Sequence, residues 1–132
     1  MNRALDLHKS GLAAVVASRE SVIVKLRPGY VYEGGEPGKD PRRCVAQDID
    51  VTFGGARLVK RPGDMPVGIL DGTLLVSGAE EPCPLRLPVR IKGTILLNLL
   101  TEKKEELCIE AAWAESTLVG TAAVVGDSMG GE

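Results

Sequence analysis

Apolar and polar residues alternate in short segments along most of the 132-residue chain. In residues 45–53, VAQDIDVTF, the apolar side chains of Ile49 and Val51 alternate with the carboxylates of Asp48 and Asp50. Successive side chains of a strand point to opposite faces. This order therefore predicts a half-buried strand with both aspartates on its solvent face.

Turn-forming residues separate these segments at intervals of roughly eight to twelve residues, which is typical of antiparallel β domains. The turns include Pro28-Gly29, Gly54-Gly55, RPGD at 61–64 and Lys92-Gly93. Only the first fifteen residues or so are compatible with a helix. The pattern predicts an all-β fold, a single antiparallel β-sandwich or barrel of about eight strands.

A long hairpin is predicted near the C-terminus, where GTILLNLL and LCIEAAWAESTLV flank the charged residues 101–106. Leu107, Ile109, Ala111 and Trp113 fall on alternate positions of its second strand. We therefore expect all four in the core.

Two segments do not fit the alternation of apolar and polar residues that a regular strand shows. Asp71-Gly72 is either the type I′ turn of a hairpin or a bulge within one longer strand. Residues 79–91 contain Pro82, Pro84 and Pro88, which lack a backbone donor, so this segment predicts an edge strand or an extended crossing.

Charge and composition exclude several partners. The 16 basic and 18 acidic residues are interspersed and give a net charge of −2, and aromatic residues make up only 3% of the chain. We therefore expect no nucleic-acid partner. No apolar run reaches the roughly 18 residues that a membrane span needs, so we expect no membrane partner either.

The cysteine and histidine content predicts free thiols and no metal. Cys44, Cys83 and Cys108 cannot all pair within one chain, and none belongs to a C-x-x-C pair, which favours a reducing, cytoplasmic location. His8 is the single histidine, far in sequence from the cysteines. We expect no metal site and no cofactor.

The segment between residues 28 and 44 is the strongest candidate for a functional surface. It is predicted as a long loop with both tyrosines and an Arg-Arg pair, and loops of this length in a compact domain are usually functional or disordered. Tyrosine and arginine are common anchors of protein interfaces. With the adjacent aspartates, the predicted binding residues are Tyr30, Tyr32, Glu33, Arg42, Arg43, Asp48 and Asp50.

These residues predict a small binding or assembly module that contacts a protein partner or a second copy of itself through residues 28–44. One alternative is a carrier of a small apolar ligand in a barrel interior. Another alternative is a small enzyme whose chemistry uses carboxylates. It is less favoured, because the sequence shows no nucleophile with a general base near it. A surface role for Asp48 and Asp50 is ion pairing, with the Arg42-Arg43 pair as the expected partners.

Several segments resemble a set of bacterial proteins that have no assigned activity. They are VKLRPGYVYEGGEPGKDP, AQD, DGTLLVSG, LRLPVRIKGTILLNLL and EELCIE, and together they extend over most of residues 22–120. The resemblance implies common ancestry and no particular chemistry. After Gly120 the chain departs from that set.

The domain boundaries follow from the last strand signal. Residues 1–122 are predicted as one all-β domain, and residues 123–132 as a flexible C-terminal tail rich in glycine. The tail contains GDSMGG, but Ser128 has no base nearby in sequence, so we expect no catalytic role for it.

Overall fold

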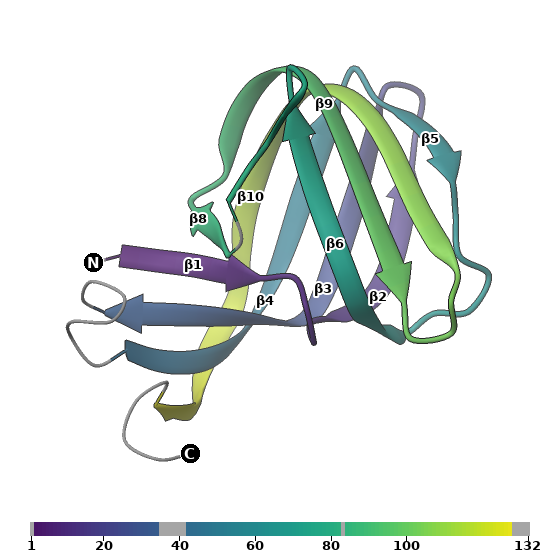
Figure 1. Cartoon of the computed structure of the whole chain (residues 1–132). Helices are drawn as coiled ribbons and strands as arrows, with labels where there is room; N and C mark the ends of the chain where they lie inside the picture. The colour runs from purple at the N-terminus through teal and green to yellow at the C-terminus, as the bar shows by residue number, and fades with distance from the viewer. Residues whose placement is uncertain (1, 35–41, 83, 128–132) are drawn as a thin grey trace.

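The computed structural model describes residues 2–34, 42–82 and 84–127, and this part of the chain consists of strands and turns without a helix (Figure 1). The predicted all-β class is confirmed, and the first fifteen residues, which were compatible with a helix, also form strands. The strands are β1 Asn2–Asp6, β2 Gly11–Ala17, β3 Ser21–Gly34, β4 Arg42–Gly54, β5 Arg57–Lys60, β6 Val67–Val76, β7 Ala79–Glu80, β8 Leu85–Leu87, β9 Arg90–Thr101 and β10 Glu106–Asp127.

Six strands form a closed antiparallel ring. Their order is β2-β6-β9-β10-β4-β3, and an additional pairing of β2 with β3 returns to the start. The β2–β6 contact is the narrowest, with only Gly11 opposite Gly68 and Leu12 opposite Val67. This ring is a small barrel, in agreement with the sandwich or barrel expected from the sequence.

The barrel interior is filled by aliphatic side chains from the alternating positions of the strands. In the predicted strand at residues 45–53, Ile49 is fully buried and Val51 nearly so, as expected. The space left among the core side chains amounts to about 20 Å³, which is room for one water molecule. The core is therefore packed and contains no ligand-sized cavity within the described residues.

The lower parts of β3, β4 and β10 continue beyond the ring and form an extension of the same sheet, here called the arm (Figure 1). In the arm, β1 pairs with β3 and β8 pairs with β1, in the order β10-β4-β3-β1-β8. Strand β8 lies at the edge of the arm and comes from the proline-rich segment. The predicted edge position of that segment is confirmed.

Register shifts on both sides of β4 mark the place where the arm leaves the barrel. On the β3 side the ladder is shifted between Leu26 and Gly29, and on the β10 side between Val119 and Ala123. Extra residues of this kind bend a strand and increase its twist. The two shifts let β4 serve both the barrel and the arm.

Two sequence predictions about connections need correction. Asp71-Gly72 lies inside β6, with a register shift between Ile69 and Asp71, so the bulge interpretation is right and the hairpin turn is wrong. The loop expected from 28 to 44 is mostly strand, because β3 extends to Gly34 and β4 begins at Arg42. The remaining residues of that loop, 35–41, lie outside the described part of the chain.

The C-terminal boundary is also later than predicted. Strand β10 runs to Asp127, and Ala123, Val124 and Gly126 pair with β4. Residues 123–127 thus belong to the sheet, whereas we expected them in a flexible tail. Residues 128–132, with Ser128, lie outside the described residues.

Trp113 was expected in the core, and this prediction is wrong. The ladder between β9 and β10 is shifted between Ala111 and Trp113, so Ala114 points into the barrel while Trp113 is 37% exposed. The indole instead lies against Gly54, which is opposite Trp113 on β4. A side-chain carbon on Gly54 would overlap the indole ring.

Replacement of Gly54 by alanine should therefore destabilise the protein by about 1 to 3 kcal/mol, because the indole must leave its place. The loss should be measured by urea unfolding. The control is the same replacement in a Trp113→Ala background, where the overlap no longer exists and most of the cost should disappear. An equal cost in both backgrounds would show that the indole is not the cause.

Candidate functional site

The predicted site residues on β4 lie on one face of the sheet. Cys44, Ala46, Asp48 and Asp50 are partly exposed, while the residues between them are buried. Opposing residues of antiparallel strands share a face, and these positions lie opposite residues of β3. We call the resulting row of side chains on β3 and β4 the outer stripe: Lys25, Arg27, Tyr30, Tyr32, Cys44, Asp48 and Asp50.

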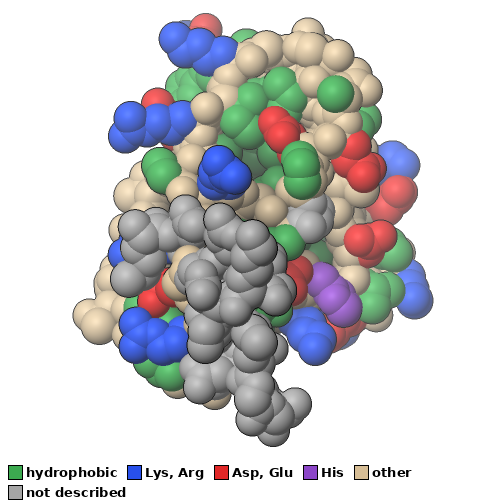
Figure 2. Space-filling model, turned by 60° about the vertical axis from the view of Figure 1, so that its left-hand side comes forward, with side chains coloured by type: hydrophobic (Ala, Val, Ile, Leu, Met, Phe, Trp, Pro, Cys, Tyr) green, Lys and Arg blue, Asp and Glu red, His purple; other side chains and the backbone are tan. Residues whose placement is uncertain are grey.

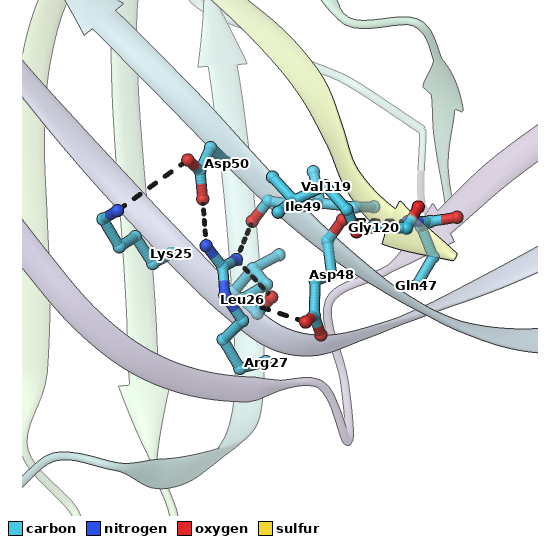
Figure 3. Close-up of polar contacts among 9 residues, drawn as sticks. All are labelled: Lys25, Leu26, Arg27, Gln47, Asp48, Ile49, Asp50, Val119 and Gly120. Atoms are coloured by element: carbon cyan, nitrogen blue, oxygen red, sulfur yellow. Dashed lines mark hydrogen bonds and ion pairs between the residues drawn. The ribbon is translucent and has the colours of Figure 1, made fainter. Parts of the chain in front are cut away.

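Arg27 holds the centre of the outer stripe together (Figure 3). Its Nη2 lies 2.8 Å from Asp50 Oδ1, and its Nε lies 3.9 Å from Asp48 Oδ2. Lys25 Nζ lies 3.9 Å from Asp50 Oδ2. Two positive and two negative charges therefore alternate in a cluster that is neutral overall.

The same guanidinium also donates to the backbone beside the β3 register shift. Arg27 Nη1 donates to the carbonyl oxygens of Leu26 at 3.0 Å and Ile49 at 3.3 Å. Pro28, the next residue, has no N–H to offer to the ladder. The Arg27 side chain is therefore both an ion-pair partner and a support of the bend.

The register shift on the other side of β4 is supported by Gln47. This side chain is buried, and Nε2 donates to the carbonyl oxygens of Val119 at 2.8 Å and Gly120 at 3.2 Å (Figure 3). Gly120 has a φ of +69°, a backbone conformation that favours glycine. Gln47 thus connects β4 to two carbonyl groups in the shifted part of β10.

The tyrosines lie at the arm end of the outer stripe. Tyr32 Oη donates to Asp6 Oδ2 at 3.4 Å, which links β3 to β1. The backbone N–H of Tyr30 donates to Ser10 Oγ at 3.1 Å, and this hydroxyl donates to the Asp6 carbonyl oxygen at 2.6 Å. Both tyrosines are therefore anchored on a paired strand and not on a loop.

Glu33 and Arg43 lie on the opposite face of the arm, which corrects the prediction of one contiguous site. They are opposite each other in the ladder, next to the buried pair Val31 and Val45. Arg3 Nε and Arg43 Nη2 lie 3.3 Å and 3.5 Å from the two oxygens of Glu33. Tyr30, Tyr32, Asp48 and Asp50 are brought together, whereas Glu33 and Arg43 are not part of that surface.

The expected partners of the aspartates also need correction. Arg27 and Lys25 pair with Asp48 and Asp50, whereas Arg43 pairs with Glu33. Arg42 is paired with Gly34 through the backbone, and the placement of its side chain lies outside what the structure describes. The strand register decides this, because Lys25 is directly opposite Asp50.

Sequence reasoning missed four polar residues that build this region: Lys25, Arg27, Ser10 and Gln47. The alternation that was recognised in β4 could have located Lys25 on the solvent face of β3. No local signal marks Ser10 and Gln47, because both are buried polar side chains whose partners are far away in the chain.

The two cysteines that the structure describes, Cys44 and Cys108, are free thiols. Burial raises the pKa of the Cys44 thiol, the nearby Asp6 carboxylate raises it further, and Lys9 opposes this. Burial is also the main cause that raises the pKa of Cys108, with Glu110 adding to it. Neither environment activates a thiolate.

The remaining chemistry of the described surface is limited. No group of three or more potential metal-ligating side chains is found among the described residues. In the face shown in Figure 2, acidic and basic side chains are interspersed and neither sign forms a continuous field. Among the described residues there is also no helix with the length and apolar character to cross a membrane.

Comparisons with known proteins give no further guide to function. No family model, no curated protein and no solved structure matches the chain. The function must therefore be argued from the geometry.

The Arg27 cluster should contribute measurably to stability because its members are only 22% to 45% exposed. Arg27→Met, which keeps the aliphatic stem, should lower the free energy of unfolding by about 1 to 2 kcal/mol. The matched control is Arg57→Met, whose 2.7 Å pair with Glu110 is 71% and 50% exposed. We expect less than about 0.5 kcal/mol there; equal losses in urea unfolding would contradict the role of Arg27 in the bend.

The raised thiol pKa values predict slow alkylation of the folded protein. A raised pKa lowers the thiolate fraction at a given pH, so Cys44 and Cys108 should react with iodoacetamide more slowly than a free cysteine peptide. The rate should increase as the pH is raised and should become normal in denaturant. Peptide mapping by mass spectrometry would measure each site, and fast labelling of native Cys44 at neutral pH would contradict the prediction.

Proposed function

We propose that this protein is a small cytoplasmic binding or assembly module that contacts a protein partner through the outer stripe. The observation that carries the proposal is the position of Tyr30 and Tyr32 beside a neutral ion cluster on two paired strands. Tyrosine combines a large apolar ring with a polar end, which suits it to interfaces. The site residues Asp48 and Asp50 belong to this surface.

The strand pairing beneath the stripe supports the proposal. The backbone of β3 and β4 is already fixed by the ladder, which lowers the entropic cost of association. The Asp6 and Ser10 contacts hold the arm end in place, and Arg27 holds the bend. A protein partner can then pack on a surface that is already formed.

The charge pattern favours a polar protein surface as the partner. Asp48 and Asp50 are matched by Arg27 and Lys25, so the stripe presents donors and acceptors without a net charge. Such a surface discriminates by hydrogen-bond geometry more than by long-range attraction. A free divalent cation is not favoured, because both aspartates already have cationic partners.

The two alternatives have less support from the geometry. A carrier of an apolar ligand needs a cavity of several hundred Å³, whereas the core space is about 20 Å³. An enzyme needs a nucleophile or base with a partner in a cleft. His8 is exposed, and Asp6 accepts from its backbone N–H and not from its ring.

Replacement of the two tyrosines by alanine tests the proposal. Tyr30→Ala and Tyr32→Ala should each weaken binding of a partner isolated with the parent protein by about 30-fold, the loss expected for an interface anchor. Arg43→Ala probes the opposite face of the arm and should leave the affinity within about threefold. Calorimetric titration measures the dissociation constants, with circular dichroism as the folding check.

If Arg43→Ala abolishes binding while both tyrosine variants bind like the parent, the contact surface is the Glu33 and Arg43 face. If all three variants bind like the parent, the arm does not contact the partner, and the proposal is wrong.

A further inference from the structure

The lower half of β10 forms an open edge of the sheet. The β9 ladder ends at Arg90 opposite Glu115, and Ser116 makes the last contacts on that side, with Val89. From Thr117 onward β10 pairs with β4 on its other side only. The backbone N–H and C=O groups on the side of β10 that faces away from β4 therefore have no described strand beside them.

This edge is apolar and uncharged. Residues 116–126, STLVGTAAVVG, contain no ionisable side chain, and Glu115 and Asp127 bound them. Leu118, Val124 and Val125 are 42%, 62% and 58% exposed, and the two valines are the most exposed large hydrophobic side chains of the described residues. β-Branched residues on an open edge favour pairing with another strand.

The other short strands near the surface have the usual protection against strand addition. Strand β8 carries Arg86 and is flanked by Pro84 and Pro88, and β5 carries Arg57 and Lys60. Charged residues and proline on edge strands oppose pairing with a further strand. The lower β10 edge has neither charge nor proline. Its β4 ladder is shifted between Val119 and Ala123 and between Val124 and Gly126, but Val124 and Val125 remain exposed there.

We infer that this edge joins two copies of the chain, with residues 121–127 of each copy paired antiparallel about a two-fold axis near Val124. A strand without charge can lie against itself in this way without placing like charges opposite each other. A two-fold contact uses the same patch on both subunits, so one exposed edge is sufficient. The pairing would join the two arms into one continuous sheet.

The surroundings of the edge allow an incoming strand. A hollow of about 360 Å³ lies beside the upper end of the edge, lined by Arg3, Leu87, Pro88, Ser116 and Leu118. The register shift between Val119 and Ala123 separates this hollow from the more exposed end. We therefore place the two-fold axis at the exposed end, where Val124 and Val125 point to opposite faces of the strand and each packs beside side chains of the second copy on its own face.

The inference is tested with the full chain by sedimentation velocity over roughly a hundredfold range of concentration. The parent should approach twice the 14.0 kDa mass of one chain as the concentration rises. Val124→Lys should raise the dimer dissociation constant at least about tenfold, because two lysines then meet at the axis. The matched control is Val59→Lys, an exposed valine of β5 at 41% exposure, which should dimerise like the parent.

Circular dichroism melting identifies a variant that does not fold. Val125→Lys then replaces Val124→Lys, and its two lysines lie diagonally across the axis on one face, where they should also weaken the dimer. A parent that stays monomeric over the whole range would overturn the inference. So would a folded Val124→Lys protein that dimerises like the parent, or a Val59→Lys protein that loses the dimer to the same extent. Neither valine lies on the outer stripe, so partner binding through the tyrosines is tested separately.

Discussion

The structure depends on strand β4 belonging to two parts of one sheet, the closed barrel above and the arm below. This requires a bend, and the bend removes ladder hydrogen bonds on both sides of the strand. An unsatisfied buried carbonyl group costs about 1 to 3 kcal/mol, which is a large part of the 5 to 15 kcal/mol that usually stabilises a domain. Arg27 and Gln47 donate to backbone carbonyl groups beside the bend, one on each side of β4.

The same bend creates the candidate surface. The Arg27 side chain crosses the shifted part of β3 and brings its charge between Asp48 and Asp50, so structural support and surface chemistry share one side chain (Figure 3). Beyond the bend, Asp6 and Ser10 connect β1 to β3 and hold the tyrosine end of the stripe. The shape of the outer stripe is therefore set by buried and half-buried polar contacts.

The bend also determines which edges are open. Because β9 stops opposite Glu115 while β10 continues into the arm, the last part of β10 has a neighbour on one side only. Strand β8, at the other end of the arm, is short and carries a charge and flanking prolines. The two edges of the arm thus differ in their capacity to accept another strand, and the proposed roles in partner binding and self-association belong to different parts of the arm.

The sequence by itself determined the fold class and much of the strand pattern. Alternation at 45–53 located β4 and put Asp48 and Asp50 on its solvent face, and the prolines after residue 81 indicated an edge strand. These features are local: a period of two and a missing backbone donor act within a few residues. The packed β9–β10 hairpin followed from the same signal.

Only the tertiary structure decided which residues form one surface. The register shift between Ala111 and Trp113 turned the indole out of the core and Ala114 into it. Continuation of β3 to Gly34 put Glu33 on the face opposite the tyrosines. A one-residue change of register reverses the face of every following side chain, and such shifts depend on partners distant in the chain, so local patterns do not reveal them.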